Sequence, residues 1–189
     1  MGQGETERGG AGAQWRAWRD AAARPGVDDK LRELYAELDA SVAARGPTCW
    51  ASGECCRFEA YGHRLYVTGL EIAWFLGQVE RGAGTGAEAG GNRGGGRAEG
   101  GGVRLPQFAE EAGSCPYQVG GRCGEHGVRP MGCRVFFCQA GTEAWQQALY
   151  EDFLGRLRGL HEAEGVAYRY MDWIAGLNEA GGAGPRGGG

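Results

Sequence analysis

The sequence predicts a small, mostly helical α+β domain whose short strands and loops are organised around a cysteine-ligated metal centre. Apolar residues recur at helical spacing over residues 31–42 and again over 145–160, which indicates two amphipathic helices. Seven cysteines fall into two short clusters, which indicates the metal centre. Scattered structural cysteines pack as small buried hydrophobes, whereas clustered thiols are typical of ligands for a soft metal.

Glycine marks the expected boundaries of the domain. The chain has 189 residues, of which 39 are glycine, and many of these lie in three stretches that cannot bury enough apolar surface to offset the entropy of ordering. We expect a disordered Gly-rich N-terminus over residues 1–13 and a disordered Gly-rich tail over 179–189. Residues 14–178 are expected to form a single cysteine-cluster metal-binding domain, interrupted by a flexible Gly-rich insertion over 82–102.

Two helices are expected before the first cysteine cluster. Residues 14–24 are predicted to form a short helix that Pro25 and Gly26 end. Asp28 is the expected N-cap of the second helix, which is predicted to continue as far as Gly46. The apolar stripe of this second helix consists of Leu31, Leu34, Tyr35, Leu38 and Val42.

A strand and a capped helix are expected after the first cluster. Residues 64–67 are typical of a short strand. Thr68 and Glu71 have the spacing of a capping box, in which the Thr hydroxyl accepts an amide proton from Glu71 while the Glu side chain accepts the amide proton of Thr68. The helix that follows has apolar residues on most of its faces, so we expect it to cross the core. These residues are Leu70, Ile72, Trp74, Phe75 and Leu76.

The C-terminal part predicts a long helix and a last short element. Thr142 is the expected cap of the long helix, and a later aromatic segment is expected to pack back onto it. The helix stripe consists of Trp145, Leu149, Phe153, Leu154, Leu157 and Leu160, and the later segment contains Tyr168, Tyr170, Trp173 and Ile174. We interpret these aromatic residues as core packing.

Charge and hydropathy exclude several classes of partner. The formal net charge of −4 argues against a nucleic-acid-binding protein, which would need a basic surface for phosphates. No apolar run approaches the roughly 20 residues that span a bilayer, and the N-terminal residues lack the apolar stretch of a signal peptide, so a membrane partner is not expected. We therefore expect a cytoplasmic protein, in a reducing compartment where thiols bind metal more often than they form disulfides.

The cysteines themselves are the candidate metal ligands. They are Cys49, Cys55 and Cys56 in the first cluster and Cys115, Cys123, Cys133 and Cys138 in the second. Thiolates bind Zn²⁺ or iron, a [4Fe-4S] cluster being one form of the iron site, and four of them complete a tetrahedral set. Seven exceed four, so either two centres exist or the surplus thiols tune one centre or react. Adjacent Cys55 and Cys56 would point different ways on an extended backbone, so they could serve two metals, or one of them could be a spare or redox thiol.

Four other residues are candidates for the surroundings of the site. His126 follows Cys123 closely and is a possible extra ligand, although a solvated loop histidine is the simpler interpretation. Arg57, Arg129 and Arg134 could donate hydrogen bonds to thiolates, or could instead pair with nearby glutamates on the surface. No catalytic residue is identified by the sequence.

The combined pattern resembles a known family. Its elements are Cys49-x5-Cys55-Cys56-Arg57, Glu71, Cys115-Pro116, Cys123, Arg129-Pro130, Cys133-Arg134, Phe136 and Cys138. This order and spacing, over residues 49–138, is similar to the YkgJ-type cysteine-cluster family. The resemblance implies a zinc- or iron-chelating domain. A related cysteine pattern occurs in flagellin lysine N-methylases, which implies an iron-sulfur cluster as one form of the site.

Metal binding is therefore the leading function, with two alternatives. An iron-sulfur enzyme for methyl transfer or oxidoreduction would need an open coordination position or a cleft beside the cysteines. A zinc-stabilised protein-interaction module would need a closed four-ligand site beside an exposed apolar patch. The sequence indicates no particular protein partner.

Overall fold

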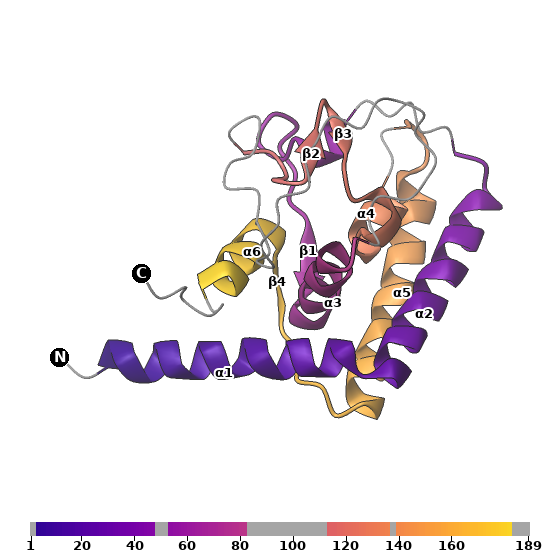
Figure 1. Ribbon diagram of the computed structural model, residues 1–189. Helices are drawn as coiled ribbons and strands as arrows, with labels where there is room; N and C mark the ends of the chain where they lie inside the picture. The colour runs from indigo at the N-terminus through magenta and orange to yellow at the C-terminus, as the bar shows by residue number, and fades with distance from the viewer. Residues whose placement is uncertain (1–2, 48–52, 83–112, 137–138, 183–189) are drawn as a thin grey trace.

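The computed structural model describes residues 3–47, 53–82, 113–136 and 139–182, and Figure 1 shows their arrangement. These residues form a mostly helical α+β domain, which confirms the predicted fold class. In chain order the α-helices are α1 (Gln3–Ala23), α2 (Pro25–Ala43), α3 (Gly69–Glu80), α4 (Met131–Val135), α5 (Glu143–Ala163) and α6 (Trp173–Gly182). The strands are β1 (Tyr66–Thr68), β2 (Gln118–Val119), β3 (Arg122–Cys123) and β4 (Tyr170–Asp172), and the 3₁₀ helices are η1 (Glu54–Cys56) and η2 (His126–Val128).

Helix α3 is the centre of the fold, and α1 crosses it. In Figure 1, α1 runs along one side of the molecule, with α3 between it and the β2–β3 hairpin. The two helices approach closely at Gly69, where a Cβ atom would lie 2.6 Å from the ring of Trp18. Trp18 is buried, and its indole N–H donates to the carbonyl of Ala167 at 2.8 Å. The absence of a side chain at Gly69 therefore lets a large aromatic ring seal the contact.

Both Gly-rich ends are more helical than expected. Helix α1 begins at Gln3, whereas the sequence predicted a disordered terminus as far as residue 13. Helix α6 continues to Gly182, four residues into the predicted disordered tail. In both cases the glycines extend a helix whose remainder packs against the core, so the tertiary contact offsets their poor helix propensity. The predicted insertion lies outside the described residues except for Gly82, which follows the end of α3.

The start of α2 differs from the prediction. The helix begins at Pro25, a favoured first position, so Asp28 lies in the first turn and is not the N-cap. The carboxylate of Asp28 instead accepts hydrogen bonds from Trp74 at 2.6 Å and Gln78 at 2.8 Å, both on α3. Asp28 thus joins two helices. The apolar stripe predicted for α2 is buried throughout.

The capping box at the N-terminus of α3 is confirmed, and its glutamate also contacts other helices. Thr68 Oγ1 accepts from the Glu71 amide at 3.2 Å, and Glu71 Oε2 accepts from the Thr68 amide at 2.8 Å. The other carboxylate oxygen accepts from the Met131 amide at 3.0 Å and from the Tyr35 hydroxyl at 3.1 Å. Glu71 is only 1 % exposed. One buried side chain therefore connects α3 to α2 and to the start of α4.

The C-terminal segment was predicted to pack back onto α5, but of its described residues only Tyr168 and Tyr170 contact that helix. Its strand pairs with β1, and its helix lies against α3. Strand β4 pairs antiparallel with β1, with Val67 opposite Met171, and α6 follows directly. The strand predicted at 64–67 is observed slightly later, as β1. Thr142 stands at the N-cap position of α5, but its hydroxyl makes no cap hydrogen bond and instead donates to the carbonyl of Gln139.

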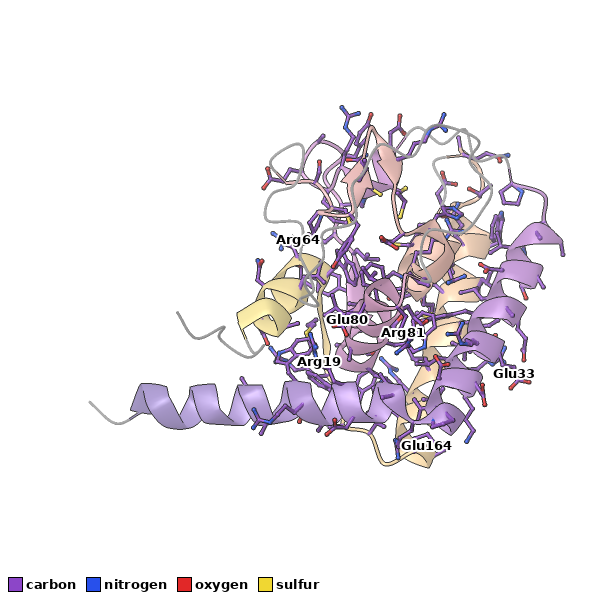
Figure 2. The ribbon with its side chains drawn as sticks, viewed as in Figure 1. Arg19, Glu33, Arg64, Glu80, Arg81 and Glu164 are labelled. Atoms are coloured by element: carbon purple, nitrogen blue, oxygen red, sulfur yellow. The ribbon has the colours of Figure 1, made fainter. Side chains whose placement is uncertain are left out.

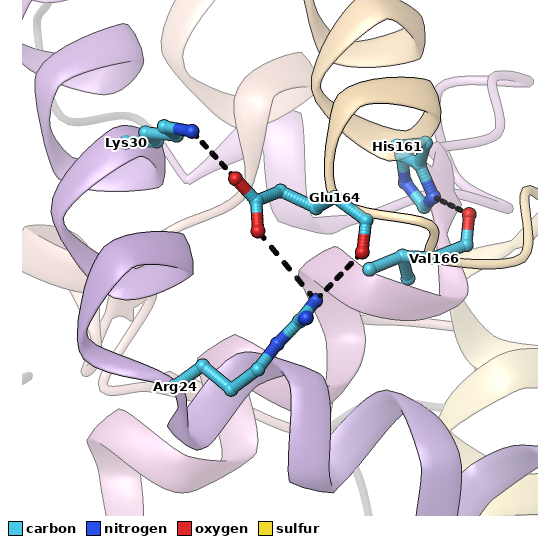
Figure 3. A network of polar contacts seen from close by, with 5 residues as sticks. All are labelled: Arg24, Lys30, His161, Glu164 and Val166. Atoms are coloured by element: carbon cyan, nitrogen blue, oxygen red, sulfur yellow. Dashed lines mark hydrogen bonds and ion pairs between the residues drawn. The ribbon is translucent and has the colours of Figure 1, made fainter.

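An exposed ion-pair network fixes the end of α5 to the α1–α2 junction (Figure 3). Lys30 Nζ lies 2.5 Å from a carboxylate oxygen of Glu164, and the Arg24 guanidinium lies 3.8 Å from the other. Arg24 also donates to the Glu164 carbonyl at 3.1 Å. Beside them, on the last turn of α5, Nδ1 of His161 is hydrogen-bonded to the carbonyl of Val166 at 3.2 Å. Solvent-exposed pairs of this kind contribute little to stability individually.

Candidate metal centre

The fold brings the two cysteine clusters together. Of the described cysteines, Cys55 and Cys56 lie in η1, Cys115 lies in the turn before the β2–β3 hairpin, Cys123 lies in β3 and Cys133 lies in α4. The Cys115 amide donates to the carbonyl of Cys56 at 2.7 Å, and the side-chain amide of Gln118 donates to the carbonyl of Gly53 at 3.0 Å. Figure 2 shows sulfur atoms gathered beneath the β2–β3 hairpin, toward α4. The segment that contains Cys55 and Cys56 thus lies against the segment that contains Cys115 and Gln118, despite their separation in sequence.

Gly53 is the point of closest approach between the two segments. Its φ of +73° is in the left-handed region, which L side chains rarely adopt. A Cβ atom at this position would collide with the backbone carbonyl of Gly121, in the β2–β3 turn, and with the Gln118 side chain. A glycine is therefore required for η1 to lie against the hairpin. Sequence reasoning did not single out this residue.

Four thiols meet around Cys56. The Cys56 side chain is hydrogen-bonded to the thiols of Cys115, Cys123 and Cys55. The contact with Cys115 has the largest effect on the pKa of Cys56, and the contact with Cys55 has the smallest of the three. Cys55 and Cys56 can both take part because η1 is a 3₁₀ turn and not an extended strand. The expectation that this adjacent pair points different ways was made for an extended backbone, and the backbone here is not extended. Cys56 and Cys115 are 7 % exposed, Cys123 is half-buried and Cys55 is exposed.

The pKa values of the four thiols are strongly displaced by their contacts. The hydrogen bond from Cys56 lowers the pKa of Cys55 to about 6 and that of Cys123 to about 7, and it lowers the pKa of Cys115 as well. The same contacts, that with Cys115 first, raise the pKa of Cys56. Cys55 and Cys123 therefore ionise more readily than an ordinary cysteine, and Cys56 less readily. Thiolates, rather than thiols, are the form that binds metal.

Cys133 lies beside this group on α4. Burial and then the negative charges of Cys115 and Cys123 raise its pKa, so its link to the other sulfurs is electrostatic. The position of α4 is set by two contacts to other helices. Glu71 accepts from the amide of Met131, and Arg134 donates to Asp39 on α2 at 2.5 Å.

The three candidate arginines have different surroundings. Arg134 is buried among carbonyls and stacks over the ring of Tyr35 at 4.5 Å, so it holds η2 and α4 in place. Arg57 lies over the ring of Tyr61 at 5.7 Å. The positive charge of Arg129 lowers the pKa of both Cys55 and Cys123. Of the predicted surrounding residues, Arg129 is the one with a described electrostatic effect on the thiol group.

The ring of His126 is hydrogen-bonded to the side chain of Arg129. The Arg129 guanidinium lies 2.6 Å from Nε2 of His126, so this ring nitrogen accepts a hydrogen bond and the ring is neutral. Burial lowers the pKa of His126, and the charge of Arg129 lowers it further. The residue itself is exposed. This arrangement matches the simpler interpretation, a solvated loop histidine, more closely than a metal ligand.

Trp173 is a neighbour of the site that sequence reasoning assigned to the core alone. Its indole N–H donates to Cys115 Sγ at 3.4 Å, and both residues are buried. The two residues are 58 positions apart in the chain, and no local motif marks the pair. Only the pairing of β4 with β1 brings Trp173 to the cysteines.

Two of the predicted ligands, Cys49 and Cys138, lie outside the described residues. The five cysteines within the described ranges are all free thiols. Among these described residues, no group of three or more His, Cys, Asp or Glu side chains is arranged so that it could hold a metal ion. The described thiols are close enough to shift one another's pKa values, but they are not arranged as a metal site. Four soft sulfur donors around one point fit the chemistry of zinc or of an iron-sulfur cluster.

A pocket of about 490 Å³ lies away from the sulfurs. It is formed by α1 and the segment after α5, with Trp18, Asp20, Arg24 and Val166 among its lining residues. It is not beside the thiols, so it does not provide the cleft that an enzyme built on the cysteine site would need.

No protein-family model, curated protein or solved structure matches the chain. None of the helices in the described ranges is long and apolar enough to cross a membrane.

Proposed function

We propose that this chain is a metal-binding protein in which Cys55, Cys56, Cys115 and Cys123 hold Zn²⁺ or iron. The observation that carries the proposal is the meeting of these four thiols around Cys56. Backbone hydrogen bonds and the close approach at Gly53 hold the two segments together, so the donors are already assembled on a common scaffold. Preassembly lowers the entropic cost of binding.

The chemistry of the donors favours a soft cation. Thiolates confined near one another repel, and a bound cation would remove that repulsion while releasing the remaining thiol proton. Arg129 offsets part of the negative charge but contributes a single positive charge. A Zn²⁺ ion would complete a closed tetrahedral Cys₄ site, and a [4Fe-4S] cluster would use the same four ligands.

The same cysteines also support a proposal about the protein's family and its cellular location. The resemblance of the cysteine pattern to the YkgJ-type family agrees with a zinc- or iron-chelating role. Free thiols of this kind persist in reducing compartments, so we propose a cytoplasmic location. We favour metal binding over the enzyme alternative, because the described pocket lies elsewhere on the molecule.

Elemental and sulfide analysis of protein purified without oxygen tests the proposal. One equivalent of zinc, or about four iron and four sulfide per chain, is expected. Cys56→Ser should lose most of the metal, because Cys56 is the common neighbour of the other three thiols. Cys133→Ser is the matched variant: it makes the same atomic change beside the group, and it should keep the metal if four ligands suffice.

Two results would overturn this proposal. One is a wild-type protein that binds neither zinc nor iron after anaerobic purification and after titration with either metal. The other is full metal content in Cys56→Ser. Loss of metal in Cys133→Ser together with retention in Cys123→Ser would move the site toward α4 and replace this ligand set.

A further inference from the structure

Trp173 holds one sulfur of the proposed site from the core side. The indole Nε1–H donates to Cys115 Sγ at 3.4 Å, a distance that suits an N–H···S hydrogen bond. Trp173 is 2 % exposed and Cys115 is 7 % exposed, so water does not compete for either atom. Hydrogen bonds to a charged sulfur in such surroundings are stronger than those to neutral acceptors.

The orientation of the indole is fixed from several directions. The Trp173 amide donates to the Leu65 carbonyl at 2.8 Å, which fixes the backbone at the β4–α6 junction. The ring meets Phe75 edge-on, with centroids 5.0 Å apart. Tyr117, which is close in sequence to Cys115, lies against the same ring at 6.3 Å. The N–H therefore cannot turn away from the sulfur without disturbing the core.

The four thiols consequently differ in their support. Cys115 is buried and accepts the indole N–H, whereas Cys55 is exposed. A sulfur that already has an N–H donor keeps one orientation, and the donor withdraws charge from the metal–sulfur bond. Outer hydrogen bonds of this type typically change metal affinity 10–100-fold.

We propose that Trp173 is a positioning residue of the cysteine site, which fixes Cys115 as the anchored ligand and thereby sets the affinity for metal. The inference rests on the proposed function, since it assigns Trp173 a role toward a ligand of that metal. It extends the site to the C-terminal β4–α6 segment, outside both cysteine clusters.

The test compares two Trp→Phe variants of the full chain. Trp173→Phe removes the N–H···S bond. Trp18→Phe is the matched control, because Trp18 is equally buried and donates to a carbonyl on the α1 side of α3, away from the hairpin. Each protein is stripped of metal under reducing conditions and titrated with Co²⁺, whose sulfur-to-cobalt charge-transfer band reports the thiolates directly, and then with Zn²⁺ in competition with a chelator.

The dissociation constant of Trp173→Phe should rise 10–100-fold, with a shifted charge-transfer band, whereas Trp18→Phe should bind as the wild type does. Benzothienylalanine at position 173, which keeps the bicyclic shape but lacks the N–H, should give the same shift without a packing defect. If Trp173→Phe and the benzothienylalanine protein match Trp18→Phe in both readouts while the wild type binds metal, the inference is overturned and the proposed function stands. A wild type that binds neither Co²⁺ nor Zn²⁺ overturns the inference; if the anaerobically purified protein also contains no iron, the proposed function is overturned as well.

Discussion

Replacing Glu71 by Gln changes one atom at the junction of α2, α3 and α4. The carboxylate accepts three hydrogen bonds, from the amides of Thr68 and Met131 and from the Tyr35 hydroxyl. Glutamine has the same shape, but one of its two terminal groups is a donor. Whichever oxygen the NH₂ group replaces, it faces a backbone N–H that can only donate.

The cost of this change follows from the burial of the donors. Thr68 is fully buried and Met131 is 1 % exposed, so the N–H that loses its acceptor has no water to replace it. A buried donor without a partner costs about 1–3 kcal/mol. In a domain of this size 1 kcal/mol corresponds to about 2–4 °C, so a mid-range loss of about 2 kcal/mol lowers the melting temperature by about 4–8 °C.

Thermal unfolding followed by circular dichroism measures the effect, with urea unfolding as a second measurement. Glu80→Gln is the matched control on the same helix, because Glu80 pairs with Arg19 at 3.4 Å on the surface, where Figure 2 labels both side chains. Its free energy of unfolding should change by less than about 0.5 kcal/mol. Equal melting temperatures for Glu71→Gln and the wild type would refute the assignment of Glu71 as the acceptor that joins the three helices.

Three further predictions concern the glycine contact, Arg134 and His161. Gly53→Ala should destabilise the fold by more than about 2 kcal/mol in urea unfolding and abolish the proposed metal binding, because it adds a backbone collision to an unfavourable φ. Gly62→Ala is the control: its φ of +66° is similar but the space around it is open, so it should cost only about 1–2 kcal/mol and keep the metal. Arg134→Lys should lose about 1–3 kcal/mol in the same assay, since two part-buried carbonyls lose their guanidinium donors, and an unchanged urea midpoint would contradict this. Asp39→Asn, on the half-exposed partner, should lose less. Burial lowers the pKa of His161 in the folded protein, so on acidification the unfolded chain takes up this proton first. The free energy of unfolding should therefore be unaffected by His161 above about pH 6.5 and fall by at most about 1.4 kcal/mol per pH unit below it. His161→Gln should lack this part of the pH dependence.

Local patterns in the sequence predicted the parts of the fold that depend on neighbouring residues. The stripe of α2 and the capping box at Thr68 and Glu71 involve residues one helical turn apart, so the sequence contains the whole interaction. Asp28 shows where this reasoning ends. Its local position suits an N-cap, but Pro25 starts the helix earlier and donors on α3 take the carboxylate. Tertiary partners decide between local options of similar energy.

The candidate site divides in the same way. The clustering of thiols predicted its donors, because the residue type alone determines their chemistry. The spatial arrangement of these thiols was not predictable from the sequence. It depends on the 3₁₀ turn at Cys55 and Cys56 and on the close contact at Gly53, and both depend on the hairpin packed against them. Trp173 was the least predictable of all, because the contact with Cys115 exists only through the pairing of two distant strands.

That strand pairing also has a consequence for how the protein is made. Cys133, the last thiol in the described ranges, leaves the ribosome about forty residues before Trp173, which corresponds to about 2–8 s at 5–20 residues per second. During this interval the nascent chain has its thiols but neither the indole that covers Cys115 nor the strand that pairs with β1. The sulfurs are then at their most exposed to oxidants and to competing metals. We therefore expect correct metal loading to follow release of the completed chain, and the yield of loaded protein to depend on how reducing the compartment is during those seconds.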